Sequence, residues 1–249
     1  MSDTVYFASD VHLGAGAPPR EAAKERAFVA FLDGLAPGDT LYLLGDVFDF
    51  WFDFDAPPPA AYRATLRALR RCVDRGVAAR FMGGNHDHWA RVGEAPGWLE
   101  REIGLELLDD PHRTCHQGWR LLLTHGDALE EPAGAYRWVR TVLRHPLAIA
   151  GFRLLPARFG YWLGDRVSRF SRSREHEREL ERYRARLVEA AGERLADADL
   201  DAVIAGHVHH PERRETGHGV YLNLGDWIDH RTYGRLRDGE LVLVRHGEG

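Results

Sequence analysis

Short apolar runs alternate with segments of helical periodicity along most of the chain. Apolar runs at 4–9, 40–45 and 77–83 predict strands, and apolar residues recur at helical spacing in 19–35 and 60–76. Four later apolar runs predict further strands at 119–124, 201–206, 219–225 and 240–246. Strands that alternate with helices in this way favour an α/β sandwich.

One long segment interrupts this alternation. Residues 129–195 contain no clear strand pattern; their first part is rich in aromatic residues, Leu and Arg. Residues 173–195 predict a charged helix in which Glu and Arg recur at i,i+4 spacing. We therefore expect a core formed by 1–128 and 196–249 and a helical insertion, or cap, formed by 129–195.

Residues of metal-ligand type follow five of the predicted strands. Because parallel strands of an open α/β sheet end at one edge, these sequence-distant loops are expected to meet there. One such motif alone is common in solvated turns, but five in succession after apolar runs predict a single site. The residues are Asp10 and His12; Asp46 and Asp49; Asn85, His86 and Asp87; His125 and Asp127; His207 and His209.

The chemistry of this set favours a pair of metal ions. Its ligand atoms are carboxylate, imidazole and amide, and Cys72 and Cys115 stand alone in the sequence. Such ligands suit Mn, Fe, Zn or Co rather than a closed thiolate site. The candidate ligands are too many for one ion, and they suit two ions about 3.5–4 Å apart that share a bridging carboxylate. Asp46 is the expected bridge.

The motifs "SDVHLG", "GDVFDFW", "GNHDHW", "THGD" and "GHVHHP" together resemble the calcineurin-like metallophosphoesterase superfamily. The resemblance implies a four-layer fold in which helices flank two mixed β-sheets. It also implies one metal ion on Asp10, His12, Asp46 and His209, and a second on Asp46, Asn85, His125 and His207.

The resemblance also implies catalytic roles beside the metal ligands. His86 would face the scissile phosphate, where an imidazole can stabilise developing charge or protonate the leaving oxygen. Asp49 would orient His86, since a carboxylate on the far ring nitrogen fixes the tautomer. Asp46 would contribute to catalysis by bridging the ions. We interpret Asp87 as a loop-bracing residue and His88 as an exposed residue without a role.

Three further features resemble UDP-2,3-diacylglucosamine diphosphatases of lipid A biosynthesis. They are the aromatic run "LLGDVFDFWFDFD", the insertion between the fourth and fifth motifs, and "YLNLGDWIDHRTYGRL" after the fifth. This resemblance implies cleavage of a UDP-linked diacyl sugar to UMP and the acylated sugar 1-phosphate, with two Mn ions, although the ligands would also accept Fe or Zn. Many members carry Arg where this chain has His86, which leaves the substrate less firmly indicated than the catalysis.

The insertion supplies the candidate contacts to such a substrate. Acyl chains need an apolar groove; the alternative is that the same residues form the cap's own small core. The groove candidates are Trp138, Val142, Leu143, Leu147, Phe152, Leu155, Phe159, Trp162 and Phe170. The polar candidates, in part implied by the resemblance, are Tyr136, Arg166, Arg169, Ser171, Arg172, Ser173 and Arg174, together with Asn85, His86 and His207 of the core. The arginines have the alternative role of solvated partners for nearby Glu.

Charge and hydropathy limit the remaining possibilities. The net charge of −5 argues against nucleic acid binding. We expect no signal peptide and no transmembrane helix, and hence a cytoplasmic protein. The expected substrate and the basic, apolar insertion further suggest a peripheral position on the inner membrane, and we infer no obligate protein partner. Two other hypotheses stay open: a related metallophosphoesterase acting on nucleotides or other phosphodiesters, and a non-catalytic scaffold. The intact ligand set argues against the scaffold.

Overall fold

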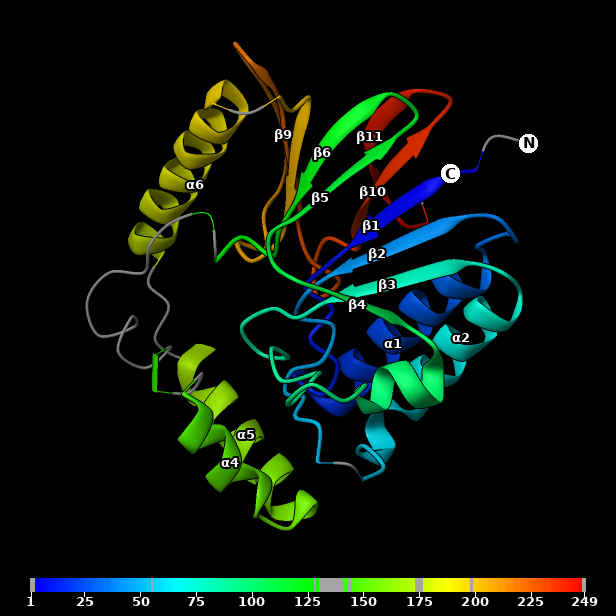
Figure 1. Ribbon diagram of the computed structural model, residues 1–249, viewed down its shortest axis with the longest axis vertical. Helices are drawn as coiled ribbons and strands as arrows, with labels where there is room; N and C mark the ends of the chain where they lie inside the picture. Colours follow the sequence, from blue (N-terminus) through cyan, green and yellow to red (C-terminus); the bar gives the residue numbers. More distant parts are fainter. Residues whose placement is uncertain are drawn as a thin grey trace.

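A computed structural model describes residues 3–54, 56–127, 129, 141–142, 145–172, 177–197 and 199–247. Two β-sheets form the centre of the molecule (Figure 1). The six-stranded sheet has the order β11-β10-β1-β2-β3-β4 and the five-stranded sheet the order β5-β6-β7-β9-β8. The first contains β1 (Val5–Ala8), β2 (Thr40–Leu44), β3 (Ala78–Met82), β4 (Glu106–Leu108), β10 (Thr232–Arg237) and β11 (Glu240–Arg245). The second contains β5 (His112–His116), β6 (Trp119–Leu123), β7 (Ala202–Ala205), β8 (Pro211–Thr216) and β9 (Gly219–Leu224).

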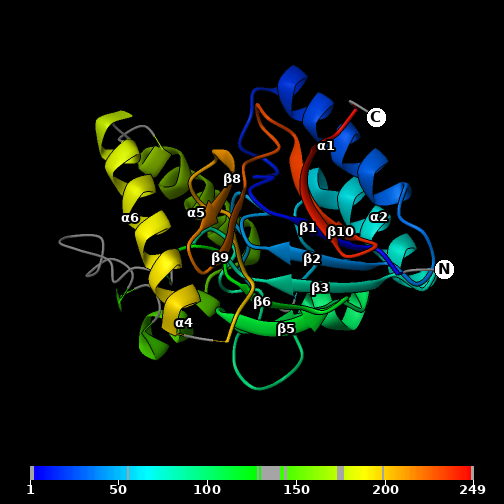
Figure 2. The ribbon, with the colours of Figure 1, turned by 90° about the horizontal axis from the view of Figure 1, so that it is seen from above.

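Both sheets are mixed, and their parallel strands determine where the functional loops lie. Strands β1, β2, β3 and β4 run parallel to one another, whereas β10 pairs antiparallel with β1. In the other sheet β6, β7 and β9 are parallel. Seen from above, β2 and β3 point towards the side of the molecule where α4, α5 and α6 lie (Figure 2). The loops after these strands therefore gather at one edge.

Helices cover the outer faces of the two sheets and complete four layers (Figure 1). Helices α1 (Pro18–Asp33) and α2 (Arg63–Asp74) pack on the six-stranded sheet, and α6 (Glu177–Asp197) packs on the five-stranded sheet. Between the sheets, Phe7 and Met82 pack in one core with Leu123, Ile204 and Leu222. The expected sandwich of two mixed sheets flanked by helices is confirmed.

Two helices lie outside the four layers. Helices α4 (Pro146–Arg153) and α5 (Ala157–Arg172) lie beside each other below the sheets in the view of Figure 1. The loop after β3 contains a single helical turn, η2 (Leu99–Ile103), and η1 (Ala60–Tyr62) leads into α2. None of the described helices is long and apolar enough to cross a membrane.

Helix α6 belongs to the sandwich although its sequence is highly charged. Its Leu187, Ala191 and Leu195 are buried and pack with Val203 of β7 and Tyr221 of β9. They recur every four residues, which places them on one side of the helix. We therefore propose that the cap within 129–195 ends before this buried half, and that α6 forms the outer layer of the core.

Truncation of Leu187 tests this boundary. We expect Leu187→Ala to lower the free energy of unfolding by about 2–5 kcal/mol, because the side chain is fully buried between α6 and the sheet. Chemical denaturation measures the change, with Arg182→Ala on the exposed side of the same helix as the control. A loss below about 0.5 kcal/mol, as for an ordinary surface residue, would place α6 in the cap instead.

Candidate metal centre

The predicted ligand residues meet at the carboxyl ends of the parallel strands, on strained backbone. Asp10, His12, Asp46, His207 and His209 all have positive φ angles, between 47° and 74°. Each such residue costs on the order of 1–3 kcal/mol unless the surrounding structure determines it. Hydrogen bonds between the loops supply that constraint, since the Asp10 N–H donates to the Gly45 carbonyl at 3.1 Å and the His12 N–H to the Asp46 carbonyl at 2.9 Å.

One group of side chains converges around His12. Its Nε2 lies 3.0 Å from His209 Nε2 and 3.8 Å from Asp10 Oδ1. His209 Nε2 is 3.3 Å from the same Asp10 oxygen. His12 and Asp10 are buried, whereas His209 reaches solvent. These three residues can hold a metal ion, because their ligand atoms lie within 4.8 Å of one another.

A second group converges around His125. Its Nε2 lies 3.0 Å from the amide oxygen of Asn85 and 3.2 Å from His207 Nδ1. His125 Nδ1 donates to the Leu44 carbonyl at 2.9 Å, because a carbonyl oxygen can only accept. That bond makes Nε2 the ring nitrogen that faces Asn85 and His207, as a metal-binding histidine requires. Although burial opposes it, the charge of Asp46 raises the pKa of His125, so a metal ion at Nε2 would take the place of a proton.

Asp46 stands between the two groups. Its Oδ2 lies 3.6 Å from His12 Nε2 and 3.5 Å from His125 Nε2, and its Oδ1 accepts the His86 N–H at 2.9 Å. The carboxylate is therefore oriented by the backbone through one oxygen and faces both groups with the other. This is the geometry expected of a bridging ligand.

The electrostatics of the centre favour positive charge. Burial alone lowers the pKa of His12, but the nearby carboxylates of Asp10, Asp49 and Asp46 outweigh it and raise that pKa to about 10. Burial and the neighbouring His125 lower the pKa of His207 to about 4. The carboxylates therefore attract positive charge. A proton on His12 can supply that charge, and a metal ion can take the place of the proton.

The residues present fit metal ions by a second observation. Asp10 Oδ2 accepts the His207 N–H at 2.9 Å, but within the part of the chain that the structure describes Asp10 Oδ1 is buried without a hydrogen bond. A buried carboxylate oxygen without a donor is costly unless a cation meets it. Asp10 Oδ1 is also the atom that His12 and His209 approach.

Two glycines let the loops approach this closely. A Cβ at Gly84 would stand 2.2 Å from Asp46 Oδ1, and a Cβ at Gly206 would stand 2.4 Å from Asp10 Oδ2. Any side chain at either position would displace a carboxylate of the centre. The ligand arrangement therefore requires glycine at both Gly84 and Gly206.

His86 lies beside the two groups with a defined tautomer. Its Nδ1 donates to the main-chain carbonyl of Asp49 at 2.9 Å, and its Nε2 is 4.0 Å from Asp46 Oδ2. Burial and the nearby His12 lower the pKa of His86, while the charge of Asp46 opposes them. A neutral His86 therefore presents a lone pair at Nε2 and donates from that atom only when an anion stabilises the imidazolium.

The partner of His86 differs from the expectation. Asp49 orients His86 through its backbone carbonyl, whereas its carboxylate lies closer to His12 Nδ1, at 3.4 Å, than to His86 Nδ1, at 3.8 Å. The cause is local, because the loop after β2 turns its backbone towards the His86 ring. The role expected for Asp49 stays a prediction, and the main-chain carbonyl of Asp49, rather than its carboxylate, contacts the ring.

The cap reaches His86 through a residue that the sequence did not indicate. Ser168 of α5 is buried, and its Oγ lies 3.0 Å from His86 Nδ1. The same Nδ1–H therefore has both the Asp49 carbonyl and the Ser168 hydroxyl within reach. No motif spacing marks Ser168, because a helix distant in sequence brings it to the site.

The aromatic run after β2 is the surface on which the cap packs. A Cβ at Gly160 would stand 2.1 Å from the Phe54 ring, and one at Gly164 would stand 2.4 Å from the Phe50 ring, so α5 lies directly on these rings. Tyr161 donates its hydroxyl to the Phe52 carbonyl at 3.1 Å. The glycines at i and i+4 of α5 thus fit the phenylalanines of "DFWFDF".

The other predicted residues have mixed outcomes. Asp87 is fully buried and braces the loops, as expected, whereas His88 is half-buried rather than exposed. Arg166 is exposed and lies over the Trp162 ring, with its guanidinium carbon 5.2 Å from the ring centre. Tyr136, Ser173, Arg174, Trp138 and Leu143 lie outside the described residues, as do the side chains of Arg169, Phe170, Ser171 and Arg172.

Comparison with known proteins agrees with this geometry. The family model described as calcineurin-like phosphoesterase matches residues 4–211. The chain belongs to the calcineurin-like phosphoesterase family. The matched residues carry every predicted metal ligand of both groups, so the family assignment and the arrangement of the site support each other.

Named relatives of this phosphoesterase extend over most of the chain. A UDP-2,3-diacylglucosamine hydrolase of Nitrosococcus oceani is 34% identical and covers 89% of this chain and 86% of its own. Proteins of the same name from Stenotrophomonas maltophilia and Xanthomonas axonopodis are 32% and 33% identical, covering 95% and 91% of this chain and 96% and 92% of their own. The similarity therefore includes the segment between the fourth and fifth motifs.

Removing the central carboxylate of the phosphoesterase site tests the metal assignment. We expect Asp46→Ala to abolish hydrolysis of a chromogenic phosphodiester and to lower the metal content, since it removes a ligand that faces both groups. Elemental analysis of the purified protein measures the metal. Asp201→Ala, which breaks an exposed pair with Arg120, is the control. Full metal content in the Asp46 variant would exclude the bridging role.

The contact from the cap generates a separate prediction. Ser168→Ala should lower kcat by about 2–10-fold, because His86 loses one of the two groups near its Nδ1–H. Metal content should remain unchanged, and Ser168→Thr, which keeps a hydroxyl, should restore most of the rate. Steady-state kinetics of the three proteins make the comparison. An Ala variant with wild-type kcat would show that the contact has no part in catalysis.

Proposed function

We propose that this phosphoesterase hydrolyses the pyrophosphate of UDP-2,3-diacylglucosamine to UMP and 2,3-diacylglucosamine 1-phosphate. The observation that carries the proposal is the paired ligand geometry in a chain whose relatives, at 32–34% identity over most of their length, are named UDP-2,3-diacylglucosamine hydrolases. A pyrophosphate is a phosphoric anhydride, which suits a centre that binds anionic phosphoryl groups.

Two groups of residues would hold the metal ions. One ion would lie on Asp10, His12, Asp46 and His209, and the other on Asp46, Asn85, His125 and His207. When bound, such ions neutralise charge on phosphoryl oxygens and favour in-line attack by water on phosphorus. We propose Mn as the native metal, although the nitrogen and oxygen ligands would also accept Fe or Zn.

His86 would act on the phosphoryl group beside the ions. Its Nδ1 is fixed by the Asp49 carbonyl, so Nε2 is the atom that faces the substrate. An anionic phosphate near Nε2 stabilises the imidazolium, which can then donate to a phosphoryl oxygen or to the leaving oxygen. Asp49 and Ser168 act here as positioning residues, because both contact the far side of the ring.

The outer face of the cap would contact the acyl chains. Five apolar side chains of α4, α5 and the turn between them are between 48% and 86% exposed: Leu147, Leu154, Phe159, Trp162 and Val167. Covering such side chains with lipid is favourable, at about 0.8 kcal/mol for each buried CH₂. Phe152, by contrast, packs 4.9 Å from the Phe52 ring and belongs to the interface between cap and core.

The same face supports a peripheral membrane location. Arg153 and Arg158 are exposed on α4 and α5 near the apolar residues, and Arg166 stands over Trp162. An apolar face with basic residues can lie in the interface of an anionic bilayer. We propose that the protein acts on the cytoplasmic side of the inner membrane and there meets a substrate that is itself anchored in the bilayer.

Substrate comparison tests the proposed function. Purified protein in Mn buffer is incubated with UDP-2,3-diacylglucosamine, UDP-N-acetylglucosamine and a chromogenic phosphodiester, and release of UMP or chromophore is measured. We expect rapid UMP release from the acylated substrate and little from UDP-N-acetylglucosamine. Comparable rates on all three would instead favour the alternative, a phosphoesterase that acts on nucleotides or other phosphodiesters.

A charged residue on the cap tests whether its apolar face binds lipid. Trp162→Asp should raise KM for the diacylated substrate about tenfold or more, because a carboxylate replaces a half-exposed indole on that face. Hydrolysis of the small phosphodiester should change little. Arg213→Asp on β8 is the matched surface control. Equal loss on both substrates would mean that Trp162 only stabilises the cap.

A further inference from the structure

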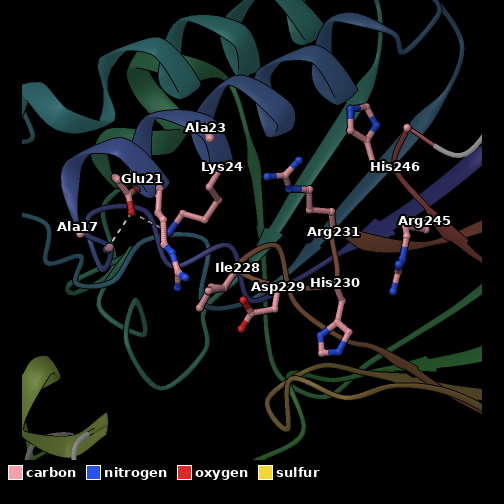
Figure 3. Close-up of a pocket in the computed structure, with 13 residues that line it drawn as sticks. Ala17, Glu21, Ala23, Lys24, Ile228, Asp229, His230, Arg231, Arg245 and His246 are labelled. Atoms are coloured by element: carbon pink, nitrogen blue, oxygen red, sulfur yellow. Dashed lines mark hydrogen bonds and ion pairs between the residues drawn. The ribbon is translucent and has the colours of Figure 1, made fainter.

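A cavity lies beside the metal centre, between α1 and the loop that follows β9. Its volume is about 930 Å³, near the upper end of the range of about 300–1,000 Å³ in which small ligands bind. Figure 3 shows Lys24 and Glu21 on α1 on one side and Ile228, Asp229 and His230 from the loop on the other. Arg231 extends between them, and Arg245 and His246 come from the end of β11.

The lining of this cavity carries positive charge in a protein whose net charge is −5. Arg20, Arg231 and Arg245 all line it. Lys24 and Glu21 offset each other in an ion pair of 2.9 Å, which leaves Asp229 as the one remaining carboxylate among the lining residues. The side chains around the cavity therefore favour an anion, and arginine is the residue best suited to phosphate oxygens.

The walls of the cavity are held by hydrogen bonds. The Lys24 Nζ is buried and donates to the His12 carbonyl at 2.5 Å. The Glu21 carboxylate accepts the N–H groups of Gly14 and Gly16 at 2.7 and 2.9 Å. The His246 N–H donates to the Arg231 carbonyl at 2.8 Å. A preformed cavity needs less ordering when a ligand binds than a flexible surface does.

These contacts also join the cavity to the metal centre. Lys24 bonds directly to the backbone of the metal-ligand residue His12. At the other wall the Trp227 N–H donates to the Asp10 carbonyl at 3.1 Å, and Trp227 directly precedes Ile228 of the cavity lining. The His230 ring lies 6.4 Å from the His210 ring, which directly follows His209. The cavity is therefore a neighbour of the site where the phosphorus would be attacked.

The cavity and the cap lie on different sides of that site. The cap packs on the aromatic loop after β2, whereas the cavity is formed by α1, the loop after β9 and the end of β11. In the six-stranded sheet β11 is an edge strand beyond β10 and β1, away from β2 and β3. A substrate with a lipid part and a polar anionic part can thus place one on each side of the metal centre.

The cavity also has one apolar contact surface. Ile228 is 36% exposed, and among the described residues it is the only exposed large hydrophobic residue outside positions 142–167. It stands at the wall opposite α1 (Figure 3). A side chain of this kind can cover the face of a planar base, while the arginines meet a phosphate.

We propose that this cavity binds the nucleoside monophosphate part of the substrate, with Ile228 covering its base and the positive charge of Arg20 and Arg231 attracting its phosphate, which would lie where the cavity meets the metal centre. The proposal rests on the proposed function, because only a nucleotide-linked substrate has such a part. It assigns the nucleotide to the β11 side of the metal centre and the acyl chains to the α5 side.

Binding of UMP to the Mn-loaded protein tests the proposal by isothermal titration calorimetry. The double variant Arg20→Gln/Arg231→Gln should weaken UMP binding about tenfold or more, because the positive charge that attracts the phosphate is lost. Arg237→Gln, in an exposed pair with Asp238 on β10, is the matched control and should leave the Kd unchanged. The two single variants are measured separately, and thermal melting confirms that each protein is folded.

Uridine and inorganic phosphate complete the experiment. The proposal requires that both bind more weakly than UMP. Phosphate that binds as tightly as UMP would overturn the nucleotide assignment in favour of a general anion site. UMP binding that is unchanged in the arginine variants and disappears when the metal is removed would show binding at the metal centre alone, and would also overturn it.

Binding and hydrolysis separate the two proposals. Arginine-dependent UMP binding without hydrolysis of UDP-2,3-diacylglucosamine would uphold the cavity and reject the proposed reaction. Hydrolysis of that substrate without arginine-dependent UMP binding would uphold the reaction and reject the cavity.

Discussion

The buried carboxylate of Asp87 is the interaction on which the arrangement of the metal centre depends. It accepts the N–H groups of Gly84 at 2.8 Å, Asp46 at 3.0 Å and Phe48 at 3.1 Å. One side chain thereby ties the loop after β3 to the loop after β2. Because Asp46 has a positive φ angle, this bond also fixes the backbone from which its carboxylate reaches both groups of ligands.

That interaction is itself sensitive to the charge of the site. Burial and the negative charge of Asp46 raise the pKa of Asp87 to about 7, although the three N–H donors oppose the shift. A cation beside Asp46 would lower the pKa of Asp87 and keep it ionised as an acceptor. The loop geometry and the metal ions are thus expected to stabilise each other, and the strain of the left-handed ligand residues is distributed over both.

The sequence predicted the parts of this structure that follow from burial and strand ends. The run "TLYLLG" becomes β2 because it is central and buried throughout, and its position brings Asp46 to the common edge. Strands β4, β5, β8 and β10 were missed. Strand β4 is an edge strand of only three residues. The other three contain polar or charged residues at alternate positions, or Gly234, because each is half-exposed or pairs at an edge. No apolar run marks strands of this kind.

Contacts between elements that are distant in the sequence could not be predicted. The Ser168 hydroxyl reaches His86 only because Gly160 and Gly164 let α5 lie on Phe54 and Phe50. The importance of those glycines follows from close packing and not from any spacing visible in the chain. The same holds for the sole lysine, Lys24, whose ammonium group donates a hydrogen bond to the His12 carbonyl.

The contacts of Ser168 with His86 and of Lys24 with His12 join the metal centre to two different surroundings, one apolar and one basic. On the α5 side an apolar cap rests on aromatic rings and touches His86 through a hydroxyl. On the α1 side a basic cavity shares its wall with the loop that carries Asp10 and His12. A phosphodiester with two identical halves would not be oriented by the difference between the apolar and the basic side. An asymmetric anhydride that joins a lipid-bearing sugar to a nucleotide would be positioned by it, because each half has a favourable environment on only one side, and the bond between the halves would then lie over the metal centre.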